Sequence, residues 1–217
     1  MELNLLKKYP KTKRNLIKRK ELKSKKNIKI ARMFGKDFFD GERKYGYGGL
    51  KYNQKYWKNV TKDFIKYYKL NNKSSILDIG CAKGYMLYDF KKALPKLKVT
   101  GIDISKYAIK NSKKEIKIFL KVGDAKKLKF KDNSFDLVIA INTIHNLNKK
   151  ECGKAIQEIA RVSKKNSYIV LDAYGSDAQK KKMLAWNLTG KTIMNKKDWK
   201  LFMKKNNYKG DYFWFTP

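Results

Sequence analysis

The sequence predicts an α/β fold: a doubly wound, mainly parallel sheet of six to seven strands, with helices on both faces and an N-terminal helical or loop cap. Two observations predict it. From residue 74 onward, short apolar runs typical of buried strands alternate with amphipathic helical patterns, which indicates βαβ units. The chain has 217 residues, 42% of them hydrophobic, which is enough for one full core and too little for two.

Three parts follow one another along the chain: a basic extension over residues 1–30, an aromatic and glycine-rich cap with a helix over 31–70, and a core over 71–217. The extension is rich in lysine and poor in apolar residues, so we expect a frayed or loosely docked helix. In the cap, Trp57, Val60 and Phe64 stand at helical spacing within residues 55–69. This spacing predicts an amphipathic helix that leads into the core.

The elements of the core begin after a breaker at residues 71–73. Buried strands are expected over residues 75–80, 98–104, 116–124, 135–142 and 167–173. Helices are expected over residues 85–92, 105–114, 149–163, 177–188 and 195–205, and Ser105 is a good N-cap for the second of them. We expect a last strand over 211–215, antiparallel to its neighbours, and a short extra strand around 192–194.

The formal net charge is +35, from 54 lysines and arginines against 19 acidic residues. Such a charge ordinarily indicates a nucleic acid or an anionic membrane surface as the partner. Here almost all of it comes from lysine, whereas selective recognition of phosphates tends to use the planar fork of arginine. We therefore interpret the surplus as a lysine-coated, solvated surface.

The same sequence disfavours three classes of protein: membrane proteins, disulfide-linked proteins and metalloproteins. No apolar run approaches the roughly 20 residues that cross a bilayer, and the N-terminus lacks the apolar centre of a signal peptide, so we expect a cytoplasmic protein without a membrane partner. Cys81 and Cys152 are too few for a disulfide framework. With His145 as the only histidine, no ligand-like spacing for zinc exists, and we predict no metal.

Three consecutive predicted strands finish with an aspartate: Asp78, Asp103 and Asp124. The carboxyl ends of parallel strands meet at one edge of the sheet, where ligands bind. Glycines at positions 80 and 84 follow the first aspartate and let the backbone pass close beneath a ligand. A dinucleotide fingerprint is disfavoured, because Ala82 and Tyr85 stand where it needs glycine. The alternative is that all three acids are ordinary turn residues.

This loop of an acid followed by glycines, with further acids 25 and then 21 positions on, resembles the class I methyltransferases, which are Rossmann-like enzymes that use S-adenosylmethionine. It resembles in particular their small-molecule branch, often called type 11. The resemblance spans about residues 74–173. It departs from the family at Ala82, where the family has a glycine.

The resemblance implies that residues at the strand ends hold S-adenosylmethionine. Asp78 would help to hold the methionine amino end, Asp103 would accept hydrogen bonds from the ribose hydroxyls, and Asp124 would address the adenine edge. The full set of implied cofactor-binding residues is Asp78, Gly80, Cys81, Ala82, Gly84, Asp103, Ile104, Asp124, Ala125 and Asn142.

Two further features concern the methyl acceptor. The family often has a histidine just beyond the fourth strand, where His145 stands; an ordinary pKa of about 6.5 suits a general base or a substrate anchor. The alternative is a packed histidine without a chemical role.

The glycine-rich stretch 44–52 is interpreted as a lid whose Tyr45, Tyr47 and Tyr52 contact cofactor and acceptor, or else as an ordinary loop. Tyr174, after the fifth strand, is another candidate acceptor contact.

The reaction that the resemblance implies is an in-line displacement, in which positioning of the acceptor and exclusion of water supply most of the catalysis. We predict O- or N-methylation of a small-molecule acceptor, for which an anionic acceptor suits the basic surface, by a monomer or homodimer. S-adenosylhomocysteine would be the product. The alternative is an RNA ribose or protein methyltransferase that uses the basic surface. A third interpretation is a non-catalytic module that binds S-adenosylmethionine.

Overall fold

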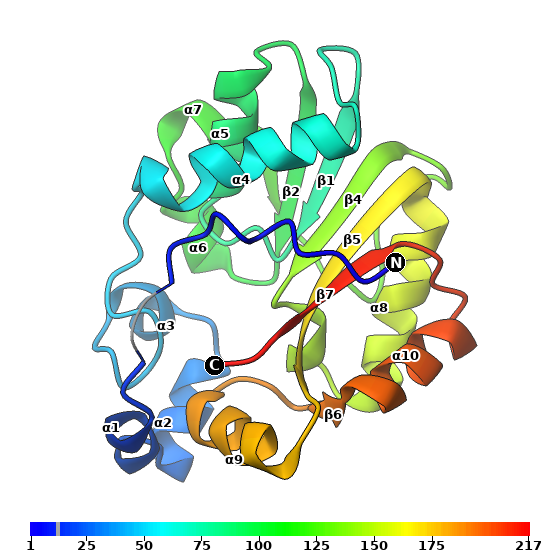
Figure 1. Ribbon diagram of the computed structural model, residues 1–217. Helices are drawn as coiled ribbons and strands as arrows, with labels where there is room; N and C mark the ends of the chain where they lie inside the picture. Colours follow the sequence, from blue (N-terminus) through cyan, green and yellow to red (C-terminus); the bar gives the residue numbers. More distant parts are fainter. Residues whose placement is uncertain (12–13) are drawn as a thin grey trace.

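A seven-stranded sheet forms the centre of the computed structural model, which describes residues 1–11 and 14–217. Residues 12–13 of the predicted basic extension lie outside the described residues. The strand order is β3-β2-β1-β4-β5-β6, and β7 also pairs with β5. Every one of these strand pairs is parallel. The predicted α/β fold, with helices on both faces, is confirmed (Figure 1).

The strands and helices have the following bounds. The strands are β1 Ser75–Ile79, β2 Lys98–Asp103, β3 Leu120–Val122, β4 Phe135–Ile141, β5 Ser163–Tyr174, β6 Met194–Asn195 and β7 Asp211–Phe215. The helices are α1 Leu16–Glu21, α2 Lys25–Ala31, α3 Lys36–Asp40, α4 Gln54–Tyr67, α5 Tyr85–Ala93, α6 Lys106–Lys110, α7 Lys114–Lys117, the 3₁₀ helix η1 Ile144–Asn146, α8 Lys149–Val162, α9 Asp177–Trp186 and α10 Lys196–Lys205.

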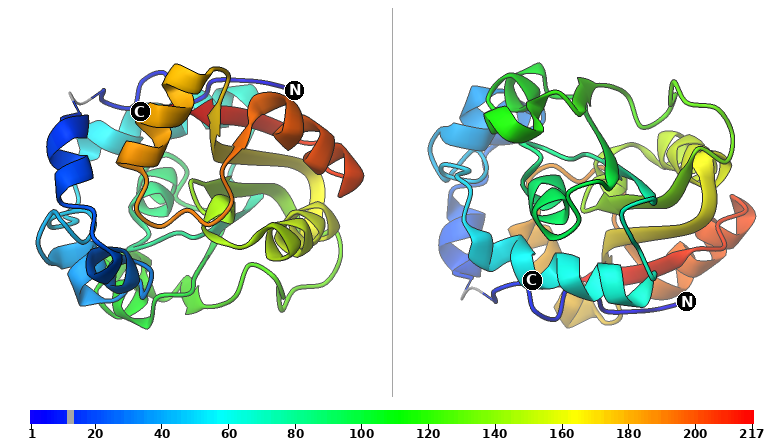
Figure 2. Two further views of the ribbon diagram at one scale, coloured as in Figure 1. Left: turned by 90° about the horizontal axis from the view of Figure 1, so that it is seen from below. Right: turned by 90° about the horizontal axis from the view of Figure 1, so that it is seen from above.

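Two hydrophobic cores lie on the two faces of the sheet. Successive strand residues point to opposite faces, so Leu77 packs with α8 and α10 while its neighbour Ile76 packs with α4 and α5. The largest buried side chain is Trp199 of α10, in the first core, and Phe64 of α4 is fully buried in the second. Both views of Figure 2 show α8 and α10 side by side.

The last strand runs parallel to its neighbour, so the expected antiparallel orientation is wrong. β7 pairs with the outer edge of β5 in a register that runs from Tyr168 opposite Asp211 to Asp172 opposite Phe215. β6 pairs with the carboxyl tip of the same strand. The ten residues of α10 then carry the chain back to the amino end of the sheet, as the helix of a βαβ crossover does. β7 therefore starts at the same end as β5.

The third strand is shorter than predicted. The sequence predicts a strand over 116–124, whereas residues 114–117 form α7 and only 120–122 form β3. The helix expected over 105–114 is also shorter than predicted, because α6 covers only Lys106–Lys110. Ile116 is fully buried, although it belongs to a helical turn. A short apolar run has no periodicity that separates a strand from a buried helical turn, which explains the error.

The first residues of the chain pack on the sheet, whereas the sequence predicts a loosely docked extension. The amide of Leu3 donates to the carbonyl of Tyr212 (2.8 Å), and the amide of Tyr212 donates to the carbonyl of Met1 (2.9 Å). Leu5 is only 5% exposed, and its amide donates to the hydroxyl of Tyr168 (3.2 Å). This segment covers the outer edge of β7, which would otherwise be an unpaired sheet edge. Figure 1 shows the N-terminus beside β7.

The helices α1, α2 and α3 cover the carboxyl end of the sheet together with α9. α3 contacts α6, which follows β2, and α1 contacts α9, which follows β5. Figure 1 shows α1, α2, α3 and α9 grouped on one side of the molecule, away from α10. The basic extension and the cap together therefore contact both halves of the edge at which a ligand is expected. Among the described residues, no helix combines the length and the apolar character needed to traverse a bilayer.

Candidate functional site

The loop after β1 is a tight turn with three residues in the left-handed region: Gly80 (φ 77°), Ala82 (φ 50°) and Gly84 (φ 72°). A Cβ atom on Gly80 would lie 2.1 Å from Oγ1 of Thr143, and one on Gly84 would lie 2.7 Å from a methyl carbon of Leu120. Both glycines are therefore required by the packing. Ala82 adopts the left-handed conformation in spite of its methyl group, so the departure from the family pattern leaves the turn intact.

Asp103, the last residue of β2, joins this loop to the helix that follows β2. Its two carboxylate oxygens accept hydrogen bonds from the amide of Ala82 and from the amide of Ser105, each at 2.8 Å. Burial raises the pKa of Asp103, while the two amide hydrogen bonds oppose this rise. Each oxygen keeps a second lone pair for a ligand. The next residue, Ile104, is 57% exposed and presents an apolar surface beside the carboxylate.

Asp78, near the end of β1, is buried, and burial followed by the negative charge of Asp103 raises its pKa to about 7. The two carboxylates are thus close enough to influence each other's ionisation. Cys81 is also buried, and burial raises the pKa of its thiol. Cys81 is consequently a small packed residue of the loop and not a reactive thiolate.

Asp124 and Asn142 continue the row of residues at the strand ends. Asp124 stands two residues beyond β3; its side chain accepts from the amide of Lys126 (2.9 Å) and is 42% exposed. Ala125 is half-buried against the core. Asn142 follows β4 in the left-handed region (φ 53°) with an exposed side chain. Because β3, β2, β1 and β4 are neighbours in this order, the predicted cofactor-binding residues lie along one edge.

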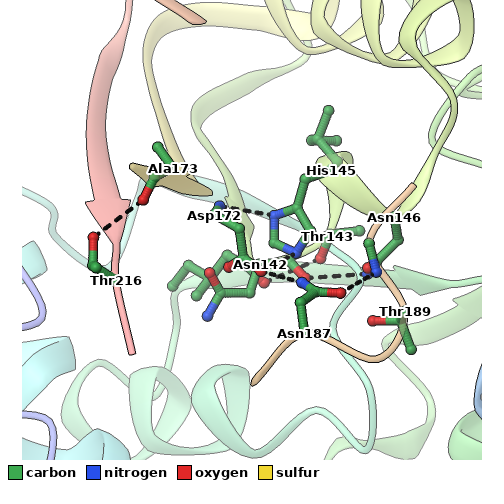
Figure 3. A network of polar contacts seen from close by, with 12 residues as sticks. Asn142, Thr143, His145, Asn146, Asp172, Ala173, Asn187, Thr189 and Thr216 are labelled. Carbon is green, nitrogen blue, oxygen red and sulfur yellow. Dashed lines mark hydrogen bonds and ion pairs between the residues drawn. The ribbon is translucent and has the colours of Figure 1, made fainter. Parts of the chain in front are cut away.

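His145 lies in η1, is 3% exposed, and makes both of its ring contacts with Asp172 of β5 (Figure 3). Nδ1 accepts a hydrogen bond from the amide of Asp172 (3.1 Å), and Nε2 lies 3.5 Å from its carboxylate oxygen Oδ2. This arrangement assigns the ring proton to Nε2. Burial lowers the pKa of His145, against the charge of Asp172. The imidazole is therefore neutral, and neither nitrogen offers a free lone pair.

Asp172 is the centre of the buried network drawn in Figure 3. Its carboxylate accepts a hydrogen bond from Nδ2 of Asn187, just after α9, and its carbonyl accepts from Nε1 of Trp199 in α10 (3.0 Å). The side chain of Asn187 in turn accepts from the amide of Gly190 (2.5 Å). These contacts fix the end of β5 against η1, α10 and the segment after α9.

The predicted lid tyrosines lie in different environments. Tyr47 is 49% exposed and stacks on Phe39 (5.8 Å between ring centroids). The hydroxyl of Tyr52 donates to Asp89 of α5 (2.6 Å), so it is directed to the helix.

Tyr45 and Tyr174 are half-buried, and each lies beneath a lysine ammonium. The ammonium of Lys44 is 5.0 Å from the centroid of the Tyr45 ring, and that of Lys180 is 5.6 Å from the centroid of the Tyr174 ring. No contact described for these two rings joins them to the aspartates at the strand ends. The acceptor roles of the four tyrosines stay predictions.

Sequence reasoning missed the link between cap and loop. Lys83, between the loop glycines, is 5% exposed, and its ammonium contacts both carboxylate oxygens of Asp40 (2.7 Å each) and the carbonyl of Leu50 (2.9 Å). The hydroxyl of Tyr107 in α6 also donates to Asp40 (2.7 Å). The cap helix α3 is thereby joined to the glycine loop. A lysine in a lysine-rich sequence carries no signal that would have identified this role.

A family model described as a methyltransferase domain matches residues 70–210. The chain belongs to the class I S-adenosylmethionine-dependent methyltransferases. Membership of their small-molecule branch stays a prediction.

The relatives of this methyltransferase domain have names that cover different reactions. A malonyl-[acyl-carrier protein] O-methyltransferase of Legionella pneumophila is 29% identical over 116 residues, which cover 52% of this chain and 40% of that protein. Norajmaline N-methyltransferase of Rauvolfia serpentina is 34% identical, covering 46% and 36%. The human mitochondrial arginine-hydroxylase NDUFAF5 is 32% identical, covering 46% and 29%. The chain therefore matches less than half the length of each of these relatives.

Solved structures give the same fold. The crystal structure of the YcgJ protein from Bacillus subtilis aligns with a TM-score of 0.55 and 20% identity, over 67% of this chain and 66% of that one. At this identity the likeness shows the fold alone.

The residues at the strand tips fit S-adenosylmethionine by their chemistry. Carboxylate oxygens accept from ribose hydroxyls and suit an ammonium group, the glycine loop allows close approach of the backbone, and exposed Ile104 offers an apolar surface for a purine. Within residues 1–11 and 14–217, no three His, Cys, Asp or Glu side chains are grouped as metal ligands. That the reaction needs no metal stays a prediction.

Proposed function

We propose that this protein transfers a methyl group from S-adenosylmethionine to a small-molecule acceptor that binds beneath the cap. The observation that carries the proposal is the position of Asp103: a buried carboxylate at the tip of β2 that fixes both the glycine loop and the start of α6, beside the exposed side chain of Ile104. A carboxylate held in this way is preorganised to accept hydrogen bonds from a pair of ribose hydroxyls.

The other strand tips complete the proposed cofactor site. Asp78 and the loop backbone of Gly80, Cys81, Ala82 and Gly84 would hold the methionine end. Asp124 and the backbone of Ala125 would address adenine, and Asn142 would line the methionine side. The support for these roles is that the residues follow four neighbouring parallel strands at one edge of the sheet.

In the proposed mechanism, S-adenosylmethionine supplies a methyl group on a positively charged sulfur that is already a good leaving group. The chain positions the acceptor and excludes water. Lys83 and Asp40 hold the cap on the glycine loop, so cofactor and acceptor would be enclosed together. His145 serves in this proposal as a positioning residue for the end of β5, because both of its nitrogens are engaged by Asp172.

A small acceptor is supported by one of the relatives, which is named as a norajmaline N-methyltransferase. The test is turnover with methyl-labelled S-adenosylmethionine against three separate pools: metabolites, bulk RNA and bulk protein. We expect label in the metabolite pool. Label in only the RNA or protein pool would contradict the small-molecule assignment.

An RNA ribose or protein methyltransferase is the second candidate, favoured by the net charge of +35. It predicts RNA binding that weakens steeply as salt rises, because phosphate contacts release counterions. Cofactor binding without labelling of any pool would instead favour the third candidate, a non-catalytic module.

A further inference from the structure

Arginine is scarce in this chain, yet three of its five arginines converge on one tryptophan. The guanidinium carbons of Arg14, Arg19 and Arg43 lie 5.1, 5.5 and 5.5 Å from the centroid of the Trp186 ring at the end of α9. We call these three residues the arginine cluster. A generally lysine-rich composition does not explain this grouping, because the three residues are arginines, whose planar guanidinium differs in its chemistry from a lysine ammonium.

The arginine cluster lines a cavity of about 300 Å³, whose wall comes mostly from the basic extension together with Arg43 of the cap and Trp186 of α9. The other lining residues are Asn15, Lys18, Leu22 and Trp186. The cavity thus combines an indole surface with positive charge and with hydrogen-bond donors. A volume of this size holds the anionic end of a small metabolite.

In the part of the chain that the structure describes, no acid pairs directly with the arginine cluster, although the charge of Asp172 acts on Arg14 and opposes the lowering of its pKa. Among the residues that the structure describes, none of the three arginines forms an ion pair with Asp or Glu. By contrast, Arg161 pairs with Glu158 (2.6 Å) and Asp132 (2.7 Å). Nε of Arg14 is buried without a hydrogen-bond partner. A buried donor of a cation that lacks a partner is costly, and a bound anion would remove that cost.

The pKa values of the three arginines shift in the direction that is expected for guanidinium groups without a paired acid. Burial lowers the pKa of Arg14 and of Arg43, and burial together with the charge of Arg43 lowers that of Arg19 to about 10. The acids beside Arg161 raise its pKa instead.

Attachment of the cap explains only part of the cluster. Arg19 donates to the carbonyls of Trp186 (3.3 Å) and Arg43 (2.7 Å). Arg43 donates to the carbonyl of Gly46. Arg14 has no such attachment among the described residues, and its guanidinium is packed between the rings of Trp186 and Phe215. Arg14 is therefore the member of the arginine cluster whose guanidinium donors form no hydrogen bond among the described residues.

The cluster also lies on the acceptor half of the site. The guanidinium carbon of Arg14 is 4.9 Å from the ring centroid of Phe215, which pairs in register with Asp172 of β5. Asp172 contacts His145 beyond β4. The carboxylates proposed for the cofactor follow β1, β2 and β3, on the other half of the same edge.

We infer that Arg14, Arg19 and Arg43 bind an anionic group of the methyl acceptor, a carboxylate or a phosphate, against the face of Trp186. The inference rests on the proposed function in one respect: it takes the bound anion to be part of the acceptor. Arg14 supplies the fork that grips two oxygens of the anion, and the other two arginines supply their remaining donors and charge.

The test is calorimetric titration of the full-length protein with succinate and, separately, with inorganic phosphate, at constant ionic strength. We expect saturable binding of at least one of them, tighter for succinate if the acceptor is a carboxylate and tighter for phosphate if it is phosphorylated. Arg14→Gln should lose affinity by at least about tenfold, because a charge-assisted pair of hydrogen bonds is lost. Arg14→Lys should fall in between, since it keeps the charge and loses the fork.

Lys26→Gln is the matched control, because it removes one positive charge from the exposed side of α2 and should leave anion binding unchanged. Each variant is also titrated with S-adenosylhomocysteine, which should bind all of them equally. The inference is overturned if neither anion binds, or if Arg14→Gln binds as tightly as wild type. Failure of S-adenosylhomocysteine to bind the wild type would overturn the proposed function instead, whatever the anions do.

Discussion

At the scale of single residues, ionisation of the buried carboxyl group of Asp78 destabilises the folded protein at neutral pH. Its folded pKa of about 7 lies above the ordinary 3.8, so the folded protein holds the proton more tightly than the unfolded chain. The contribution of this group to stability is therefore complete at low pH and is lost as the pH rises from about 4 to 7. Such a cost at a ligand site is expected when the charge serves binding.

Asp78→Asn should accordingly make the ligand-free protein more stable at pH 8 and nearly unchanged at pH 4. It should also weaken binding of S-adenosylhomocysteine. Urea unfolding at the two pH values measures the first effect, and calorimetry measures the second. Asp37→Asn, at an exposed position in α3, is the control. A variant that is less stable than wild type at pH 8 would show that the ionised carboxylate of Asp78 stabilises the fold.

His145 gives a second prediction at this scale. His145→Gln keeps an acceptor for the buried amide of Asp172, so it should retain turnover within about threefold and leave the pH profile of kcat unchanged. His145→Leu removes that acceptor and should cost about 1–3 kcal/mol of stability. Loss of about a hundredfold in kcat for His145→Gln, together with loss of one limb of the pH profile, would restore the general base role.

The residues that sequence reasoning could identify are those whose chemistry is local. Asp78, Asp103 and the two loop glycines are recognisable because their spacing and strand-end position follow from one continuous segment. Lys83 and Arg14 could not be found, because their significance depends on Asp40 and Trp186, which are distant in the sequence.

At the scale of elements, the pair of Lys83 and Asp40 joins α3 to the loop between β1 and α5. The ammonium is nearly buried, and the carboxylate is 25% exposed and also bonded to Tyr107. Lys83→Met leaves Asp40 without its cation and should cost about 2–3 kcal/mol, less than for a fully buried pair because of that exposure.

Lys83→Met combined with Asp40→Asn should cost less than the sum of the single changes, as measured by a double-mutant cycle in urea. The matched control is the exposed pair of Lys44 and Glu42, whose coupling should be about 0–1 kcal/mol. Additive effects of Lys83 and Asp40 would mean that the two groups do not join cap and loop energetically.

The docking of the first residues on β7 gives another prediction for an element. Leu5→Ala should destabilise the protein by about 2–3 kcal/mol, because it leaves a cavity in the core beneath α4. Ile17→Ala, at a side chain that is 75% exposed in α1, should have almost no effect. Equal urea midpoints for Leu5→Ala and wild type would indicate that the N-terminal segment contributes nothing to the core.

Element prediction succeeded where the periodicity was long and failed at the edges of the sheet. The helix over 149–163 and the strand over 211–215 agree with α8 and β7 to within one residue, because each has a clear start and a full apolar pattern. The strand over 116–124 and the antiparallel orientation of 211–215 were wrong. Both concern edge strands, whose length and direction are decided by the connections around them and not by their own residues.

At the scale of the whole molecule, cofactor and acceptor are assigned to two halves of one sheet edge. The carboxylates lie at the ends of β1, β2 and β3, while the arginine cluster lies near the end of β7, and the basic extension and the cap together contact both halves. This division separates a cationic cofactor from an anionic acceptor, each beside charges of the opposite sign. The net charge of +35 is then mostly a surface property, and only a few arginines contribute to recognition.

The central claim is that Asp103 organises a site for S-adenosylmethionine at the strand tips. Its most direct test is calorimetric titration with S-adenosylhomocysteine of the wild type, Asp103→Asn and the control Asp37→Asn. The predicted result is one site per chain in the wild type and the control, with affinity lowered at least about tenfold in Asp103→Asn, because the amide group turns a donor toward Ala82 or Ser105. No binding to the wild type, or equal binding to Asp103→Asn, would contradict the claim.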